Sequence, residues 1–285
     1  NFFLDEKKEV AQGIVPNPDV VSSKNIKKLP SKRIESENIK IKNGVFIVDK
    51  GTFKKLSTSE KKYIKPVYEP YLIKKYFIDE NDKEIIYITK KNYKNDCPTL
   101  IKHLAKYKEI MEERRENQQG KLSFYHLHWA RDEYFFEQGA KILSVRKCST
   151  PTFSYTENEA YVMMSFNVIK SNRIEQKYLT ALLNSKLVAF WLRHKGKMQG
   201  NNFQVDKEPI LDIPIFNTPD DDKKSKIITL VDLLLQYNKD LSTATLPNDI
   251  TQLKERIQNT ESKIDQLVYE LYNLTPQEIE LVEKS

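Results

Sequence analysis

The pattern of apolar and polar positions divides the chain into a mixed front and middle part and a helical tail. Two runs in the first hundred residues are typical of strands: residues 44–48, which open with an Asn-Gly pair, and residues 84–89. Asp96 before Pro98 is a favourable helix start, and apolar residues then recur at helical spacing up to Met111. We therefore expect short strands followed by an inserted helix.

Strands return in the middle of the chain. We expect them at residues 141–145, at residues 152–155 and, as one longer strand, at residues 160–169. An amphipathic helix is then predicted for residues 176–191, because its apolar positions share one face. A polar loop rich in glycine and amide side chains, residues 193–204, follows it.

The tail changes to heptad spacing. Apolar residues between 227 and 241 mark one helix, and residues 242–247 break it. The second helix carries a seam with alternating three- and four-residue steps, formed by Ile250, Leu253, Ile257, Ile264, Leu267 and Leu271. This spacing predicts an antiparallel helical hairpin, and a capping box, Thr275 to Glu278, begins a short last helix.

The predicted fold class is therefore α+β. Mixed short-stranded sheets with inserted helices are followed by a C-terminal antiparallel helical hairpin. We place the boundary between the mixed part, residues 1–216, and the helical tail, residues 217–285, in the proline- and aspartate-rich segment between them.

The net charge of +7 is unevenly distributed along the chain. Residues 20–76 contain 15 Lys or Arg and 5 Asp or Glu, whereas residues 204–285 contain 9 and 16. This asymmetry indicates a polyanionic partner for the front and middle, although a solvated lysine-rich surface explains the composition equally well. The aromatic content of 11% would supply stacking surfaces to a nucleic-acid binder.

The two cysteines and the absence of long apolar runs indicate the cellular compartment of the protein. Cys97 and Cys148 provide neither a disulfide framework nor zinc-ligand spacing, which indicates a reduced, cytoplasmic protein. No apolar run approaches the roughly twenty residues that a membrane span requires, and no signal peptide is visible. The first residue is Asn1 and not a methionine, from which we expect a fragment of a longer protein.

The sequence contains no convincing catalytic motif. It has no glycine-rich phosphate loop. Asn17-Pro18-Asp19 has some likeness to an amino-methyltransferase motif but lacks the aromatic residue that would stack on a flipped base, so we interpret it as a turn. The run Pro219 to Lys224 contains the letters of a nuclease motif, but contiguous residues in a linker cannot converge on a metal from separate strands. We expect an exposed linker with a helix N-cap there.

His126 and His128 form the only histidine pair that could be considered as metal ligands. Both would have to leave the same face of a strand, and the further ligands nearby are Asp132 and Glu133. Histidines on a surface among aromatic residues are the commoner case. We therefore predict no metal site.

The polar loop at residues 193–204 carries the strongest chemical signal for function. Arginine and lysine suit guanine edges and phosphates, and asparagine and glutamine suit adenine edges. Two glycines would let the backbone approach a groove closely. An ordinary polar loop remains the alternative interpretation. The candidate DNA contacts of this loop are Arg193, Lys195, Lys197, Gln199, Asn201 and Asn202, and Arg146 with Lys147 forms a second basic candidate.

Several segments, taken in order, resemble the C-terminal specificity domain of TaqI-like adenine methyltransferases and of fused type IIG restriction-modification enzymes. The most specific is Leu182 to Leu187, Leu-Leu-Asn-Ser-Lys-Leu. The others are Ala11 to Val15, Gly44 to Val48, Tyr63 to Pro66, Lys74 to Tyr76, Pro98 to Arg115, Lys141 to Leu143, Pro151 to Phe153, Ile213 to Ile215 and Ile264 to Thr275. Val15 to Pro18 departs from the family, which usually has a Thr-Gly-type turn there.

The resemblance implies a DNA target-recognition domain over residues 1–216 that carries no catalysis of its own. Such a domain grips duplex DNA against a separate methyltransferase domain, which binds S-adenosylmethionine and flips the adenine. No cofactor is then expected in this chain, the partners are double-stranded DNA and the parent's own methyltransferase domain, and the parent could also be an endonuclease. The resemblance adds Gln12, in the opening Gln-Gly strand, to the expected DNA contacts.

Two other functions stay open on the sequence. The first is a non-enzymatic assembly module, whose heptad tail would dock a methyltransferase or a phage-defence partner. The second is an RNA-binding module. The loop at residues 193–204 distinguishes them from DNA recognition, because an assembly module has no use for it.

Overall fold

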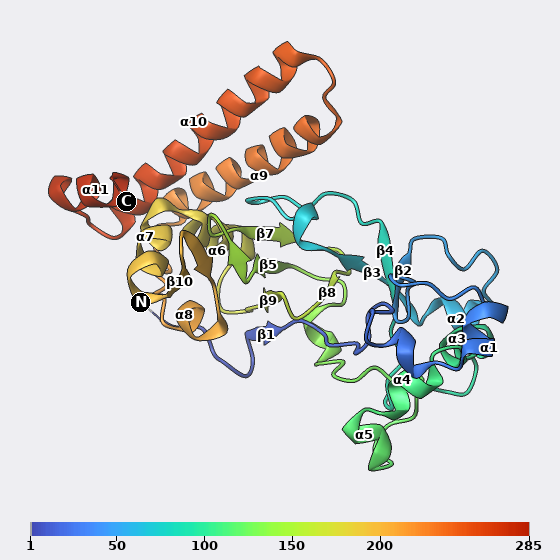
Figure 1. The fold of residues 1–285 in the computed structure, drawn as a ribbon. Coiled ribbons are helices and arrows are strands. Elements are labelled where there is room, and N and C mark those ends of the chain that lie inside the picture. Colours follow the sequence, from blue (N-terminus) through green and yellow to red (C-terminus); the bar gives the residue numbers. More distant parts are fainter. Residues whose placement is uncertain (1, 285) are drawn as a thin grey trace.

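A four-stranded antiparallel sheet lies at the centre of the computed structural model, which describes residues 2–284 (Figure 1). Its strands, in spatial order, are β1 (Val10–Gln12), β9 (Phe166–Ile169), β5 (Lys141–Val145) and β7 (Phe153–Thr156). Alternate residues serve different cores: Ile142 and Ile169 face one, and Leu143 and Val168 face the other. The sheet is therefore buried on both faces, and apolar side chains point to both sides of it.

The front core lies beyond one face of this sheet, around a second four-stranded sheet. Its strands, in spatial order, are β2 (Ile47–Asp49), β4 (Lys83–Ile86), β3 (Ile64–Tyr68) and β8 (Tyr161–Val162). Short helices are inserted around it: η1 (Ile26–Lys28), α1 (Ser31–Ser36), α2 (Thr58–Lys61), η2 (Pro70–Leu72), α3 (Pro98–Ala105), α4 (Lys108–Glu112), α5 (Arg115–Gln118) and η3 (Glu133–Phe135). The helix expected after Asp96 begins at Pro98 as predicted, but it is interrupted between α3 and α4.

The single long strand expected at residues 160–169 is wrong. The chain forms two strands there, and they belong to different sheets: β8 pairs in parallel with β3, and β9 pairs with β1 and β5. Residues 163–165 turn the chain between them. An apolar run that is buried on both faces does not reveal from its own pattern where it changes partners.

The second core lies beyond the other face of the central sheet and is covered by helices. The helix expected at residues 176–191 is two helices, α6 (Gln176–Asn184) and α7 (Lys186–Lys195). Ser185 between them has an extended backbone, and its hydroxyl accepts a hydrogen bond from the Val188 amide at 3.3 Å, which starts α7 in a new direction. A short helix, α8 (Lys207–Leu211), contributes Ile210 to the same core.

The tail is a pair of long antiparallel helices that projects from the body, followed by a short one (Figure 1). These are α9 (Asp221–Thr243), α10 (Pro247–Leu271) and α11 (Pro276–Glu283). The expected N-cap and capping box are confirmed: the Asp220 side chain accepts from the Lys223 amide, and Thr275 and Glu278 cap α11 reciprocally. Together with the sheets, this hairpin confirms the predicted α+β class.

The heptad seam divides into two halves. Ile264, Leu267 and Leu271 are buried in the second core, whereas Leu253 and Ile257 are only partly buried. The body-proximal half of α10 therefore holds the hairpin on the body, and the distal half serves mainly to pair with α9. No helix among residues 2–284 is both long and apolar enough to cross a bilayer.

Candidate nucleic-acid interface

The polar segment after α7 is a β-hairpin and not the irregular loop that we expected. Arg193 and Lys195 belong to the last turn of α7, and the hairpin strands are β10 (Lys197–Gln199) and β11 (Asn202–Gln204). Gly200, with φ of 59°, takes the first position of the two-residue turn, a position that favours glycine. The backbone is thus fixed by ladder hydrogen bonds, and the amide side chains project from a rigid element.

The hairpin has one apolar and one polar face. Phe203 is buried in the second core and Met198 packs against that core, so the hairpin is anchored to the body through its apolar face. Alternation places the side chains of Lys197, Gln199, Asn202 and Gln204 on the opposite face. Apolar and polar residues do alternate along both strands of the hairpin, but the glycines and amides around them are more typical of a loop.

The third strand of this small sheet, β6 (Lys147–Cys148), brings in the second basic candidate. β11 pairs with β6 so that Gln204 lies opposite Lys147 and, on its other side, opposite Lys197. The hairpin and the Arg146-Lys147 pair, some fifty residues apart in sequence, therefore form one polar surface, which we call the hairpin face. Its exposed members are Lys147, Lys197, Gln199, Asn201 and Asn202. Arg193 and Lys195 are also exposed, but they belong to the last turn of α7.

A chain of hydrogen bonds orients the side chains on this surface. Gln199 Nε2 donates to Gln204 Oε1 at 2.8 Å, and Gln204 Nε2 donates to Asp206 Oδ2 at 2.7 Å. Asp206, which is buried, accepts from Arg146 Nη2 at 2.6 Å and from its Nε at 3.2 Å. Arg146 Nη1 donates to the Met164 carbonyl at 3.0 Å. Asp206 was not singled out from the sequence, where nothing distinguishes it from other acidic residues after a strand.

The hairpin face borders a surface hollow of about 460 Å³. The hollow is lined by Pro70, Val145, Arg146, Lys147, Met164, Ser165, Gln199, Gln204 and Asp206. Its walls combine two cationic side chains, two amides, the Asp206 carboxylate and apolar atoms. Cationic and amide groups are those that contact phosphates and base edges. Arg193 does not line the hollow: it lies over the ring of Phe203, 5.2 Å from the ring centroid, and Phe203 belongs to the apolar face of the hairpin.

Gln12 lies one layer deeper than the other candidates. It is partly buried at the end of β1, opposite Asn167 of β9, and the Asn167 side chain donates to the Val205 carbonyl at 2.8 Å. The ends of β1 and β5 and the start of β9 meet at one end of the central sheet. Gln12 therefore shares this sheet end with Arg146 but is separated from the hairpin by Asn167. Its contact with DNA stays a prediction.

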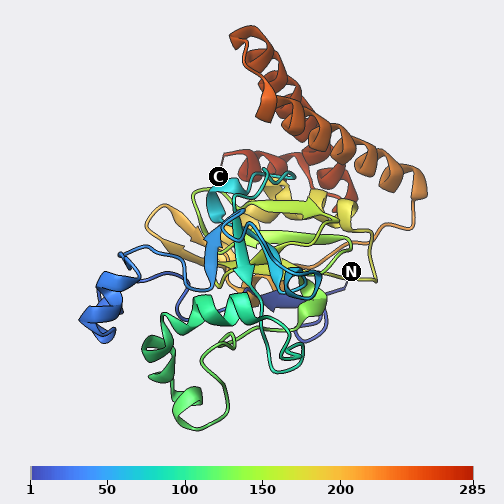
Figure 2. The same ribbon diagram turned by 90° about the vertical axis from the view of Figure 1, so that its right-hand side faces the viewer.

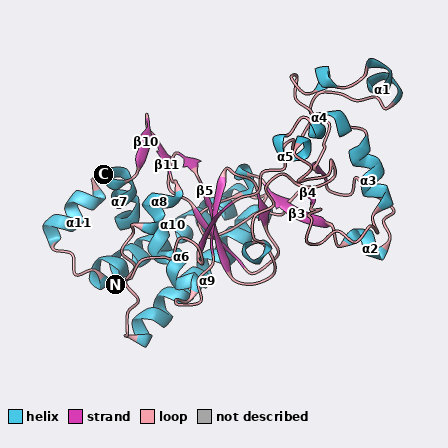
Figure 3. Ribbon diagram, turned by 90° about the horizontal axis from the view of Figure 1, so that it is seen from below, coloured by secondary structure: helices cyan, strands magenta, loops and turns pink. Residues whose placement is uncertain are grey.

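The basic segment at residues 20–76 is exposed in the front lobe. Within residues 2–284, nine of its lysines are exposed and have no carboxylate within 4.0 Å: Lys24, Lys27, Lys32, Lys40, Lys42, Lys50, Lys54, Lys55 and Lys61. Figures 2 and 3 show α1 of this lobe and the β10–β11 hairpin projecting to the same side of the central sheet. The helical hairpin α9–α10 extends in another direction (Figure 2).

The remaining motifs take structural places. Asn17-Pro18 lies in a loop whose Asn17 Nδ2 contacts His128 Nδ1 at 3.3 Å, and His128 Nε2 bonds Glu116 at 2.7 Å. His126 is buried among aromatic rings, and this burial, with the charges of Lys90 and Arg114, lowers its pKa to about 4. Among residues 2–284, no three His, Cys, Asp or Glu side chains converge as metal ligands would.

Comparison with known proteins points to one family. The sequence profile of the TaqI-like C-terminal specificity domain matches residues 65–215. A stretch of 158 residues, 52% of this chain and 30% of the relative, is 25% identical to the type II methyltransferase M.HincII of Haemophilus influenzae. The segments expected to open and close the family pattern, near Gln12 and after Ile264, lie outside the profile match, so their assignment stays a prediction.

Two solved structures can be aligned with most of the chain. The type IIL restriction-modification enzyme MmeI, solved in complex with DNA, matches 97% of this chain and 35% of its own, with a TM-score of 0.60 and 11% sequence identity. The type IIG restriction endonuclease BpuSI matches 92% of this chain and 30% of its own, with a TM-score of 0.43 and 14% identity. The MmeI match establishes a shared fold. The chain spans about a third of the length of each of these three relatives.

Proposed function

Because the chain belongs to the family of TaqI-like C-terminal specificity domains, we propose that it recognises a base sequence in double-stranded DNA for a restriction-modification enzyme. The observation that carries this proposal is the hairpin face. It presents amide and basic side chains from three hydrogen-bonded strands, beside a hollow in which Arg146 is fixed by Asp206. Direct readout of base edges requires such side chains held in place.

In this proposal the front lobe contacts phosphates and the hairpin face contacts bases. Phosphate contacts position a protein on DNA without reading sequence, and exposed unpaired lysines suit them. The nine lysines of the front lobe fit this role, and the amides Gln199, Asn201 and Asn202 fit base readout. Because α1 and the hairpin project to the same side, one duplex could contact both.

The finer proposal concerns the rest of the parent enzyme. The chain would hold the duplex against a methyltransferase domain outside these residues, and S-adenosylmethionine would bind there. We assign no methyl transfer and no cleavage to this chain, and none of its residues to the cofactor. Its part in modification would be to place the target base within reach of that domain.

A second candidate function, assembly with a partner protein, is favoured by the distal half of the helical hairpin. Leu233 of α9 and Leu246 in the connection to α10 are 39% and 62% exposed, and Leu253 is only partly buried. Exposed apolar side chains on a long helical hairpin can receive another helix. This role and DNA recognition use different surfaces and do not exclude each other.

Selection from a pool of duplexes with a randomised centre tests the first function. The full 285-residue chain should enrich one sequence pattern over successive rounds. Its affinity for the selected duplex should fall steeply as salt rises: the logarithm of the binding constant, plotted against the logarithm of the salt concentration, should have a slope of about −0.9 per phosphate contacted. A matched RNA duplex and matched single strands serve as controls. Absence of duplex binding at low salt would contradict the proposal, and preference for RNA would replace it with the RNA-binding alternative.

A further inference from the structure

Trp129 is held as an outward-facing ring on an unusually well-anchored segment. Its side chain is 48% exposed, yet its amide donates to the Val15 carbonyl at 2.9 Å and its carbonyl accepts from the Val15 amide at 3.0 Å. On either side, the Leu127 amide donates to Ile88 at 2.9 Å and the Ala130 carbonyl accepts from the Tyr87 hydroxyl at 3.1 Å. The backbone therefore offers the indole little freedom to fold back onto the protein.

Neighbouring side chains fix the orientation of the ring. His128 stacks on the indole, with ring centroids 4.8 Å apart and planes inclined by 21°. His128 is itself bonded to Glu116 and Asn17. The Arg131 guanidinium lies 5.5 Å from the indole centroid, and its Nε donates to the Gly13 carbonyl at 3.1 Å. The result is a half-exposed indole with the His128 imidazole stacked on it and the Arg131 cation over the ring.

A buried arginine organises the loops beneath this surface. Arg114 is 6% exposed and donates hydrogen bonds to backbone carbonyls of three separate stretches: Met111, Asn17 and residues 123–126. It thereby joins the end of α4, the loop that follows β1 and the loop that leads to Trp129. The loop from which Trp129 projects is therefore held in place at residues 123–126.

Trp129 also lies at the same end of the central sheet as the hairpin face. Gly13, which follows β1, binds Arg131 through its carbonyl and is packed against the Met163 carbonyl. The adjacent Met164 is 53% exposed and its carbonyl accepts from Arg146. Contacts therefore run continuously from the hollow to the indole. Along this path the exposed apolar side chains are Met164 and Trp129, and the cationic ones are Arg146 and Arg131. Wedges that enter DNA between base steps combine these same properties.

We propose that Trp129 stacks on the face of a nucleobase that becomes unstacked in the bound duplex, with the Arg131 cation beside the neighbouring phosphate. The inference rests on the proposed DNA recognition and adds a contact that reads no base edge. Base-aromatic stacking tolerates sequence, because every base has a π face. Trp129 would therefore contribute affinity and DNA deformation, while the hairpin face would contribute sequence preference.

The chain contains two tryptophans, which allows a matched pair of variants. Trp191→Phe leaves Trp129 as the only indole, and Trp129→Ala leaves Trp191, whose side chain lies in an apolar groove with Leu187 and Ile213. Each variant of the full chain is titrated with the selected duplex and with its single strands. Tryptophan emission and the anisotropy of a labelled DNA are followed together, and Trp129→Phe tests whether an aromatic ring suffices.

The expected result is quenching of Trp129 emission that follows the anisotropy curve, without change in Trp191 emission. Trp129→Ala should bind about 5- to 150-fold more weakly, which corresponds to roughly 1–3 kcal/mol per stacked base, and Trp129→Phe should recover most of the affinity. Stronger quenching by single strands than by the duplex would identify unpaired DNA as the source of the base.

Unchanged Trp129 emission on a duplex that binds, together with full affinity of Trp129→Ala, would overturn this inference and leave DNA recognition intact. If the unchanged chain binds no DNA at all, DNA recognition fails and the stacking role fails with it. The Trp191 emission of Trp129→Ala reports whether that variant is folded. Because Trp129 is half exposed, we expect the Trp129→Ala variant to fold.

Discussion

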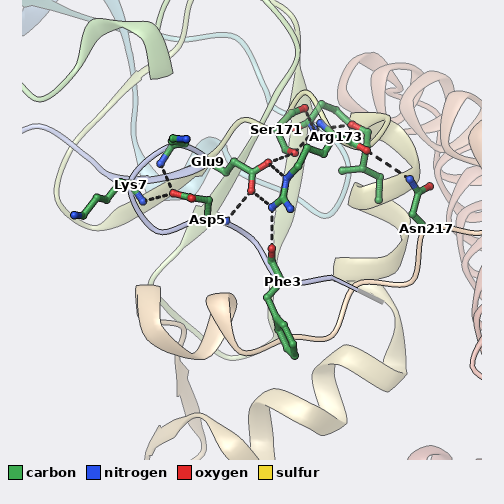
Figure 4. Close-up of polar contacts among 10 residues, drawn as sticks. Phe3, Asp5, Lys7, Glu9, Ser171, Arg173 and Asn217 are labelled. Atoms are coloured by element: carbon green, nitrogen blue, oxygen red, sulfur yellow. Dashed lines mark hydrogen bonds and ion pairs between the residues drawn. The ribbon is translucent and has the colours of Figure 1, made fainter.

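Arg173 forms a two-pronged ion pair with Glu9, which precedes it by 164 residues (Figure 4). The guanidinium Nε donates to Glu9 Oε1 at 2.8 Å, Nη2 donates to Oε2, and the same Nη2 reaches the Phe3 carbonyl at 2.8 Å. The Asp5 amide and the Ser171 hydroxyl donate to the remaining sites of the carboxylate. Glu9 is 5% exposed, so this network fixes the N-terminal segment to the edge of the central sheet.

Loss of the Glu9 charge is expected to destabilise the fold. Glu9→Gln should lower the free energy of unfolding by about 1.5–3 kcal/mol, the usual contribution of a hydrogen bond to a charged group. Glu6→Gln is the matched control, because Glu6 belongs to the same segment, is 66% exposed and lies 3.7 Å from its partner, Lys207. Equal urea midpoints for the two variants would contradict the structural role of Glu9.

The same network predicts a pH dependence of stability. Burial raises the pKa of Glu9, but hydrogen bonds from Arg173, Ser171 and the Asp5 amide outweigh it and lower the pKa to about 2 from its ordinary value of 4.5. A carboxyl with a depressed pKa in the fold stabilises above its unfolded pKa, and this contribution is lost as the pH falls through the folded pKa. The stability difference between the unchanged chain and Glu9→Gln should therefore narrow as the pH falls from about 5 to about 2. A constant difference over that range would argue against it.

Substitutions on and next to the hairpin face should distinguish residues that recognise bases from residues that bind phosphates. Gln199→Ala or Asn201→Ala should relax the preference at one base position, because a paired base contact discriminates by about 1–3 kcal/mol. Lys195→Ala or Lys197→Ala should weaken binding to all duplexes alike, and should reduce the slope of the logarithm of affinity against the logarithm of salt concentration by about 1. Selection with each variant and salt titration measure the two effects. Lys254→Ala, an exposed position on α10, is the control. Four variants with unchanged preference, affinity and salt slope would assign the readout to other residues, with Arg146 and Lys147 the next to test.

Gly13 should tolerate no side chain. A Cβ atom there would lie 1.9 Å from the Met163 carbonyl oxygen and 2.6 Å from that of Val162, so the backbone itself would have to move. Gly13→Ala should lower the thermal midpoint and weaken DNA binding, because the same residue holds Arg131. Gly120→Ala meets open space and is the comparison, with only the cost of its left-handed backbone, roughly 1–2 kcal/mol. A midpoint for Gly13→Ala no lower than that of Gly120→Ala would refute this packing.

The two halves of the tail seam should differ in their response to truncation. Leu267→Ala should cost about 2–5 kcal/mol, because the side chain is 8% exposed in the second core. Leu253→Ala, at an equivalent heptad position but only partly buried, should cost much less. Chemical denaturation of both variants measures this. Similar losses would mean that the whole α9–α10 hairpin is clamped to the body.

Local signals in the sequence were sufficient for the elements whose stability is local. The heptad spacing located α9 and α10, the capping residues located the starts of α9 and α11, and the apolar run at residues 141–145 located β5 to the residue. Periodicity and capping depend on residues within a few positions of one another, so they can be read without knowledge of the fold. The α+β class follows from the same signals.

Only the tertiary structure decided which surfaces the candidate residues form. Arg146 and Gln199 line one hollow because β11 pairs with both β6 and β10. The run at residues 160–169 divides because its halves join different sheets, and the segment of Trp129 is held in place by its pairing with Val15. These partners lie far apart in the chain. Strand pairing is selected by the burial of whole faces and not by the residues that pair, and for that reason no local pattern could have placed the hollow beside the hairpin.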